Sequence, residues 1–208
     1  MARRSKSSSQ WLREHFNDPF VRRAQAEGWR SRAVFKLEEV DRREKLLRSG
    51  QVCLDLGAAP GAWSQYARRR VGPRGRVIAT DILEIEPLEG VEFIMGDFRD
   101  EAVFERLLAL LSEQRVDVVL SDMAPNLSGI DAVDQPRSMH LSELALDMSR
   151  HVLKPEGTAL IKVFQGAGFT ELIAAARKVF RGVKLLKPES SRARSPELYL
   201  LAKHLRLV

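Results

Sequence analysis

A lysine lies within an otherwise apolar run in the last quarter of the chain. Lys162 follows Ala159-Leu160-Ile161 and precedes Val163-Phe164, a pattern that predicts a buried strand. A buried lysine costs free energy unless it is paired or functional. A lysine on an edge strand that extends to water is the alternative, but a central parallel strand is normally apolar on both faces. We therefore interpret Lys162 as a chemical group, and its residue type permits the role of proton acceptor.

A second lysine and two acids are candidates for the surroundings of Lys162. Lys36 lies among Val34, Phe35 and Leu37; burial and this second ammonium would each lower the pKa of Lys162 toward that of a usable base. Asp122 opens the motif Asp122-Met-Ala-Pro-Asn126 and is placed to orient a substrate or the lysine. Glu197 begins the last predicted strand and would reach the same edge of the sheet. The spacing leaves open whether these four side chains meet, and taken alone Lys36 and Glu197 read as ordinary surface charges.

Aspartates close four predicted strands. Asp55, Asp81, Asp97 and Asp122 each end an apolar run, so we expect all four at the edge of an open α/β sheet where ligands bind. One such aspartate would usually cap a turn or a helix. Four in succession indicate a ligand site, although one or two of them are compatible with capping.

The segment Asp55-Leu-Gly-Ala-Ala-Pro-Gly61 occupies the first strand-to-helix turn. Gly57 permits a tight turn and a close approach of the backbone to a ligand. The middle glycine of a dinucleotide-binding motif is absent and Pro60 removes an N–H, so a cofactor without phosphates fits better. S-adenosylmethionine is such a cofactor. Asp81, 24 residues after Gly57, is placed to bind its ribose, and Asp97 to accept from its adenine amino group.

The elements that must position these residues alternate between strands and helices. We predict strands over 51–55, 76–80, 91–95, 116–121, 158–164, 183–187 and 198–202, and helices over 31–48, 62–70, 101–112, 137–153 and 169–180. This alternation implies an α/β, Rossmann-like fold with a mostly parallel seven-stranded sheet and helices on both faces. The last two strands have no helix between them and should form an antiparallel hairpin. Residues 11–30, broken by Asn17-Asp18-Pro19 and Gly28, are expected to be irregular.

The positive charge of the chain is concentrated at its N-terminal end. Residues 1–50 hold 13 Lys or Arg and 7 Asp or Glu, which accounts for the whole net charge of +6. Such clustering is expected of a protein that binds a polyanion, although a solubilising face would explain it equally well. We divide the chain into a basic, partly mobile arm (1–30) and one domain (31–208), with Arg30 and Arg32 as candidate RNA ligands.

The composition excludes several other classes. Cys53 is the one cysteine, which rules out an intramolecular disulfide and a multi-cysteine metal site. The histidines lack metal-ligand spacing, so we predict no metal and assign them no role. No apolar run approaches the length of a membrane span, and the basic N-terminus lacks the apolar region of a secretory signal. We expect a cytoplasmic protein without a membrane partner.

Six stretches of the chain form a recognisable set. They are Ser31-Arg-Ala-Val-Phe-Lys-Leu37, Asp55-Leu-Gly-Ala-Ala-Pro-Gly61 with Trp63-Ser-Gln-Tyr66, Gly96-Asp-Phe-Arg-Asp100, Ser121-Asp-Met-Ala-Pro-Asn-Leu-Ser-Gly129, Lys162-Val-Phe-Gln-Gly166 and Lys187-Pro-Glu-Ser-Ser-Arg-Ala-Arg-Ser195. Together they closely resemble the FtsJ/RrmJ family of 2′-O-ribose RNA methyltransferases, from about residue 30 to 202. Ala62 departs from the pattern, since bacterial members usually carry glycine there.

The resemblance implies the Rossmann-like fold of S-adenosylmethionine-dependent methyltransferases and a Lys-Asp-Lys-Glu catalytic tetrad. The tetrad falls here on Lys36, Asp122, Lys162 and Glu197, with Lys162 as the proton acceptor. The implied cofactor contacts are Gly61, Trp63, Asp81, Asp97 and Asp122. Trp63 enters through the resemblance alone and would otherwise be interpreted as a core aromatic.

The resemblance also implies a substrate, a uridine in the A loop of 23S rRNA within the large ribosomal subunit. Arg192 and Arg194 would hold phosphates near the target ribose, with a solvated hairpin loop as the alternative. Enzymes acting on the tRNA anticodon loop or the mRNA cap share the tetrad, so the substrate class is open among them. A nicotinamide-dependent oxidoreductase is disfavoured by the turn at Pro60. A non-catalytic RNA-binding or ribosome-assembly factor would leave Lys162 unexplained, and a monomer is the default.

Overall fold

Parallel strands and helices alternate along most of the chain. The structure, a computed structural model, describes residues 18–111, 114–126, 128–192 and 195–206. Within them lie seven strands, β1 Val52–Leu56, β2 Arg76–Asp81, β3 Val91–Met95, β4 Val116–Ser121, β5 Leu153–Phe164, β6 Phe180–Leu186 and β7 Glu197–Leu205. They form one sheet in the order β3-β2-β1-β4-β5-β7-β6. The first five are parallel, whereas β7 runs antiparallel to both of its neighbours. The predicted sheet with its C-terminal antiparallel hairpin is confirmed.

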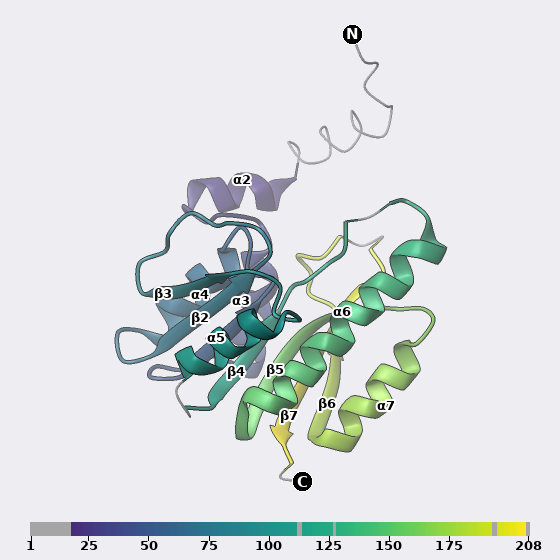
Figure 1. Cartoon of the computed structure of the whole chain (residues 1–208). Coiled ribbons are helices and arrows are strands. Elements are labelled where there is room, and N and C mark those ends of the chain that lie inside the picture. Colours follow the sequence, from purple (N-terminus) through teal and green to yellow (C-terminus); the bar gives the residue numbers. More distant parts are fainter. Residues whose placement is uncertain (1–17, 112–113, 127, 193–194, 207–208) are drawn as a thin grey trace.

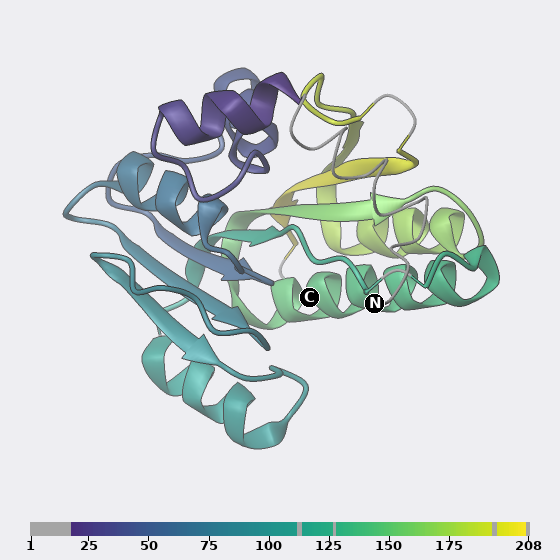
Figure 2. The same ribbon diagram turned by 90° about the horizontal axis from the view of Figure 1, so that it is seen from above.

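Helices cover both faces of this sheet. The described residues contain α2 Pro19–Ala26, α3 Val34–Glu44, α4 Ala62–Val71, α5 Glu101–Leu111, α6 Asp131–Val152 and α7 Phe169–Val179. The first three lie on one face and the last three on the other (Figure 1, Figure 2). A separate apolar cluster fills each of the two interfaces. The central strand β1 is buried at every residue, which is why its sequence reads as a continuous apolar run interrupted only by Asp55.

Helix α2 corrects the expectation that residues 11–30 are irregular; residues 11–17 lie outside the described part. Asp18 is the N-cap of α2, and its Oδ1 accepts a hydrogen bond from the Phe20 amide at 3.0 Å. Pro19 occupies the first helical position, where its missing N–H costs no hydrogen bond. The sequence Asn17-Asp18-Pro19 is therefore a helix start and not a break. Helix α2 packs on α3 through Phe20 and Phe35, whose ring centroids are 5.6 Å apart.

Several helix boundaries also differ from the prediction, two of them by four residues or more. Helix α3 ends at Glu44 and not at Arg48, because Lys45 adopts a left-handed backbone conformation with φ of 53°. Helix α6 begins at Asp131, earlier than the predicted residue 137, and contains Pro136. Pro136 is the sixth residue of α6, past the first four amides that have no intrahelical partner, so it removes one hydrogen bond, the one that its N–H would donate to the main-chain oxygen of Ala132.

Strand β5 is longer than predicted. It begins at Leu153 because Lys154-Pro-Glu-Gly157 is an irregularity inside the strand and not a turn before it. Val116 pairs with Leu153 and Val118 pairs with Thr158, so the register shifts across this segment. Glu156 has a φ of 66°, the local backbone change that a bulge requires.

No helix among the described residues is both long and apolar enough to cross a membrane. No group of three or more His, Cys, Asp or Glu side chains among them is arranged to hold a metal ion.

Candidate active site

Lys162 and Asp122 form an ion pair at the carboxyl ends of β4 and β5. The Lys162 Nζ lies 2.7 Å from Asp122 Oδ1 and donates to the main-chain oxygen of Asp122 at 3.1 Å. Lys162 is only 8% exposed, and its two oxygen partners offset the cost of burying an ammonium. The structure thus brings together the lysine and the aspartate that the sequence singled out.

Tyr199 fixes the other side of the same carboxylate. Its hydroxyl donates to Asp122 Oδ1 at 2.6 Å, and it lies directly opposite Lys162 in the pairing of β5 with β7. Its ring is fully buried and packs on Trp63, with centroids 5.7 Å apart. We did not predict this residue. The available signal was its position two residues after Glu197, which places both side chains on one face of a strand.

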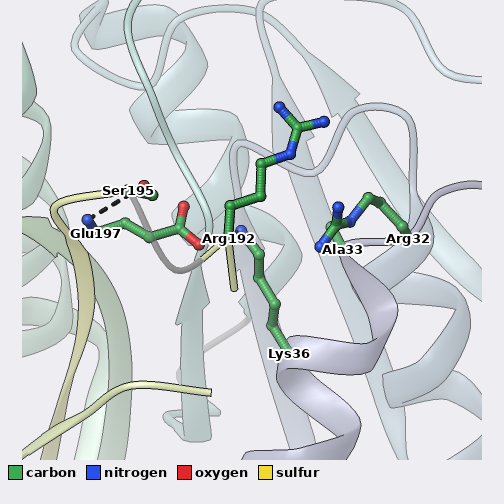
Figure 3. A pocket seen from close by; sticks show the side chains of 6 residues that line it. All are labelled: Arg32, Ala33, Lys36, Arg192, Ser195 and Glu197. Carbon is green, nitrogen blue, oxygen red and sulfur yellow. Dashed lines mark hydrogen bonds and ion pairs between the residues drawn. The ribbon is translucent and has the colours of Figure 1, made fainter. Parts of the chain in front are cut away.

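Lys36 and Glu197 form a second ion pair beside the first. The Lys36 Nζ lies 2.8 Å from Glu197 Oε1 and 5.7 Å from the centroid of the Tyr199 ring. Figure 3 shows Lys36 extending from α3 toward the carboxylate of Glu197. The four predicted side chains therefore come together as two ion pairs, with Tyr199 in contact with both. We call Lys36, Asp122, Lys162 and Glu197 the tetrad.

Both carboxylates of the tetrad are held in the ionised form. Burial acts to raise the pKa of Asp122, but the ammonium groups of Lys162 and Lys36 and the hydrogen bonds from Lys162 and Tyr199 outweigh it and lower the pKa. Burial likewise acts to raise the pKa of Glu197, and the charge and hydrogen bond of Lys36 lower it. The tetrad is thus two cations and two anions with no net charge.

A cavity of about 500 Å³ opens at the carboxyl ends of β1, β2, β3 and β4. We call it the aspartate cavity, because three of the four predicted aspartates line it. Its lining comprises Gly57, Ala59, Thr80, Asp81, Ile82, Leu83, Gly96, Asp97, Phe98, Arg99, Asp122, Met123, Ala124, Pro125, Asn126, Arg137, His140, Leu141 and Leu144. Asp122 is the member of the tetrad that reaches it.

Backbone amides and one arginine orient the aspartates of this cavity. Asp81 accepts from the amides of Ala59 and Leu83, each at 2.8 Å. Asp97 accepts from both the amide and the guanidinium of Arg99, and the Arg99 hydrogen bond lowers the pKa of Asp97. An ionised carboxyl has about four lone-pair sites, so Asp81 keeps acceptor capacity for a ligand. Asp97 also accepts from Arg99 Nη2, so a ligand would have to replace one of its hydrogen bonds with Arg99.

Two further features of the cavity wall are suited to a ligand. A Cβ on Gly57 would lie 2.3 Å from the Met123 Cγ, and the φ of Gly57 is +73°, so the turn admits only glycine without a shift of the wall. The Oγ1 of Thr80 is buried and has no hydrogen-bond partner among the described residues. Buried hydroxyls normally have one.

Asp55, the fourth aspartate, lies beneath the cavity and not in its lining. It is 1% exposed and points toward α4, where Ser64 Oγ donates to its Oδ2 at 2.6 Å. Its Oδ1 has no hydrogen-bond partner among the described residues. Burial raises the pKa of Asp55 to about 7. The expectation that all four aspartates share one edge therefore holds for three of them.

Gly61 and Trp63, which only the resemblance implied as cofactor contacts, lie outside the linings of the cavities described here. Gly61 begins α4 with a φ of 101°, and Trp63 is 3% exposed and donates from its indole to the main-chain oxygen of Ala33 at 2.8 Å. Trp63 occupies the core position that its residue type indicated. A direct cofactor contact for either residue stays a prediction.

A second cavity, of about 460 Å³, lies beside Lys36 and Glu197. Its other lining residues are Arg32, Ala33, Arg192 and Ser195, and we call it the arginine cavity (Figure 3). Lys36 and Glu197 thus face one cavity while Asp122 faces the other. The tetrad lies between a site lined by carboxylates and a site lined by cations.

The four candidate RNA ligands fall into three groups. Arg32 and Arg192 both line the arginine cavity. Arg30 instead donates to the main-chain oxygens of Pro60, Glu86 and Pro87 at 2.6–3.1 Å, and so fastens the loop after β2. Arg194 lies outside the described residues.

Helix α6 contributes residues that the sequence reasoning missed. Arg137 and His140 line the aspartate cavity, although we assigned the histidines no role. Their separation of three residues places them on one helix face. Both residues lie within the predicted helix 137–153, so this spacing was the available signal.

The fold and the two cavities together define a class. A Rossmann-like sheet whose penultimate position is filled by an antiparallel last strand is the fold of S-adenosylmethionine-dependent methyltransferases. A solved structure of Aeropyrum pernix fibrillarin, containing natively bound S-adenosyl-L-methionine, has this fold, with a TM-score of 0.56 and 18% identity over 83% of this chain and 74% of that chain. A Plasmodium falciparum protein provisionally named a ribosomal RNA methyltransferase is more similar, with a TM-score of 0.76 and 28% identity over 85% of this chain and 98% of that chain.

The sequence relatives narrow the class to a family. Residues 29–205 match the FtsJ-like methyltransferases, and the chain belongs to this family. A protein of Stenotrophomonas maltophilia strain K279a named "Ribosomal RNA large subunit methyltransferase E" is 59% identical over 97% of this chain and 96% of its own length. A Marinobacter nauticus protein of the same name is 53% identical over 98% of this chain and 99% of its own length. The resemblance drawn from the sequence motifs is confirmed.

Proposed function

We propose that this protein transfers a methyl group from S-adenosylmethionine to the ribose 2′-hydroxyl of a uridine in the A loop of 23S rRNA, in the large ribosomal subunit. The observation that carries the proposal is the position of the tetrad between the aspartate cavity and the arginine cavity. A cationic cofactor and an anionic substrate can then meet at the tetrad from opposite sides.

The residues of the aspartate cavity fit S-adenosylmethionine. When bound, this cofactor supplies a methyl group on a positively charged sulfur. Asp81 is the acceptor for its ribose hydroxyls and Asp97 the acceptor for its adenine amino group, while Ile82, Leu83 and Phe98 offer apolar surface to the base. The wall at Gly57 and the unpartnered hydroxyl of Thr80 support a polar ligand held close to the backbone.

The tetrad supplies the acid–base chemistry. Lys162 first releases its ammonium proton to solvent. As the neutral amine it then takes the proton of the 2′-hydroxyl, so that the oxygen that attacks the methyl carbon carries more negative charge. Asp122 and Tyr199 fix the position of the Lys162 Nζ. Lys36 places a second positive charge nearby, and Glu197 holds Lys36 in place. Alignment of the hydroxyl with the methyl group contributes much of the rate.

The RNA substrate is supported by charge and by the relatives. The arginine cavity presents Arg32, Lys36 and Arg192, and phosphates of an RNA backbone pair with such groups. The names of the relatives refer to ribosomal RNA of the large subunit, which makes this substrate preferable to tRNA or an mRNA cap. We propose that the protein acts as a monomer in the cytoplasm, where ribosomes are.

Transfer of labelled methyl from S-adenosylmethionine tests the proposal. The acceptors are large subunits from a strain that lacks the modification, the matching naked rRNA, and bulk tRNA, each mapped for 2′-O-methylation. We expect label at one A-loop uridine of the intact subunit. Label on tRNA alone would contradict the proposed substrate and keep the chemistry. If the protein binds the cofactor and labels none of the acceptors, a non-catalytic assembly factor becomes the better explanation.

A further inference from the structure

A carboxylate of the protein itself faces two of the arginines that line the arginine cavity. Asp18 Oδ2 forms an ion pair with Arg32 Nη1 and lies 3.9 Å from Arg192 Nη2. The Asp18 side chain is 9% exposed and that of Arg32 is 16% exposed. Two guanidinium groups from segments 160 residues apart therefore face one carboxylate at the edge of the cavity.

The structure holds Arg32 in position independently of Asp18. Its guanidinium also donates to the main-chain oxygen of Ser190 and lies 5.3 Å from the centroid of the Phe20 ring. Burial, followed by the charge of Arg192, lowers the pKa of Arg32. The guanidinium groups of Arg32 and Arg192 are close together and partly removed from water, so an anion that lies between them is bound favourably.

Asp18 divides its two oxygens between separate tasks. Oδ1 accepts from the Phe20 amide as the N-cap of α2, while Oδ2 faces the arginines. A carboxylate is not needed for the capping task, since asparagine and serine are equally good N-caps. Capping therefore does not need the negative charge of Asp18, and that charge faces Arg32 and Arg192.

The two arginines that face Asp18 line the same cavity as two residues of the tetrad. Arg32, Arg192, Lys36 and Glu197 line one continuous cavity (Figure 3). A nucleotide whose ribose lies against the tetrad has phosphodiesters on both sides of that ribose, and one of them must pass through this region.

We propose that Arg32 and Arg192 bind a backbone phosphate next to the methylated ribose, and that in the free protein the Asp18 carboxylate holds this position and competes with the phosphate. The inference rests on the proposed function, since it assumes that RNA enters the arginine cavity. It assigns to Asp18 a regulatory role: the residue keeps the arginine site closed to weakly bound anions, and RNA must displace it.

Substitution of Asp18 by asparagine tests the competition. The D18N change keeps the N-cap and removes the charge, so we expect KM for unmodified large subunits to fall about threefold to tenfold, with kcat within twofold of wild type. The matched control is Glu27→Gln, at the other end of α2, where Glu27 pairs with Arg23 outside the cavity. E27Q changes the net charge of the same helix equally and should leave KM within twofold. An unchanged or higher KM for D18N would overturn the proposal, because it would make the Asp18 pair neutral or supportive for RNA binding.

Two further variants serve as controls for the effect of D18N on KM. If D18N lowers the melting temperature, Asp18→Ser, a second capping residue without charge, replaces it. In an Arg32→Gln background the D18N change should alter KM less than twofold, because the arginine for which the Asp18 carboxylate and the RNA phosphate compete is absent. A threefold to tenfold fall in KM in that background would also overturn the proposal. Failure of the proposed function is a separate outcome, recognised when wild-type protein labels no large-subunit RNA.

Discussion

The two cavities on either side of the tetrad differ in the sign of the charge they present. Three carboxylates line the aspartate cavity, and one of its arginines, Arg99, is already paired with Asp97. Three cations and one carboxylate line the arginine cavity. The tetrad between them is internally neutral. Under the proposed function, this difference would direct the cationic cofactor and the anionic RNA to opposite sides of the tetrad before any specific contact is made.

The two sides also differ in how their buried acids titrate. Burial without a cationic partner raises the pKa of Asp55 beneath the aspartate cavity, whereas the pKa of Glu197 at the arginine cavity is lowered by Lys36. Acidification therefore neutralises two different charges. Protonation of Asp55 removes a negative charge that burial disfavours, whereas protonation of Glu197 removes a negative charge that Lys36 stabilises.

Removal of Lys162, which belongs to the tetrad between the two cavities, should have the largest effect on activity. Lys162→Ala should lower kcat by about 10²–10⁴-fold, because it removes the group to which we assign the proton of the hydroxyl. The dissociation constant of S-adenosylmethionine, measured by calorimetry, should change by less than about threefold. Lys154→Ala is the control, since Lys154 lies in the same strand and pairs with Asp117. Equal losses in kcat and in cofactor affinity would contradict the assignment of Lys162 as the base.

The pH dependence of stability in an Asp55→Asn variant tests whether Asp55 has the raised pKa that distinguishes it from Glu197. The folded-state pKa of about 7 lies above the unfolded value of 3.8, so the folded state binds more protons between these values and wild-type stability falls as pH rises. Between pH 5 and pH 8 the wild type should lose at most about 3 kcal/mol relative to D55N in the free energy of unfolding. Urea titrations at both pH values measure this. Asp147→Asn, which removes an exposed carboxylate of α6, should follow the wild type; parallel curves for D55N and wild type would show that Asp55 is ionised at little cost.

A substitution on the cofactor side should affect only one ligand. Asp81→Asn removes the charge and should weaken S-adenosylmethionine binding about tenfold, the effect of losing one charge-assisted hydrogen bond. KM for large subunits should remain within twofold, in contrast to D18N. Glu105→Gln, on the exposed side of α5, is the charge-matched control. A D81N variant that lost RNA affinity and kept cofactor affinity would break the division into two sides.

The parts of the fold carried by local patterns were predictable. Apolar runs such as those of β1 and β4 have one physical explanation, burial between two layers of helices, and their order fixes the sheet. The start of α2 was misread because Asn17-Asp18-Pro19 combines residues that favour turns with residues that begin helices. The irregularity inside β5 is a tertiary effect, since the pairing with β4 continues across a segment whose composition indicates a turn.

The candidate site was predictable where a charged residue lies in or at the end of an apolar strand. Lys162 in an apolar strand and the aspartates at strand ends stand out without any coordinates. Tyr199 does not, because a tyrosine in a strand is ordinary and only its hydroxyl contact with Asp122 makes it distinctive. The ion pair of Asp18 with Arg32 joins α2 to the segment before α3, and its contact with Arg192 depends on how the C-terminal hairpin folds back.

The position of β7 has a consequence for synthesis of the protein. This strand is the last in the chain, yet it is inserted between β5 and β6 and carries Glu197 and Tyr199. Until the ribosome has released it, β5 and β6 each lack a neighbour, and the Lys162–Asp122 pair lacks its tyrosine. A chain that lacks β7 keeps the residues that line the aspartate cavity but has neither Glu197 nor Tyr199. Under the proposed function we therefore expect it to lack methyl transfer activity, and the strand edges that β7 covers would be unpaired.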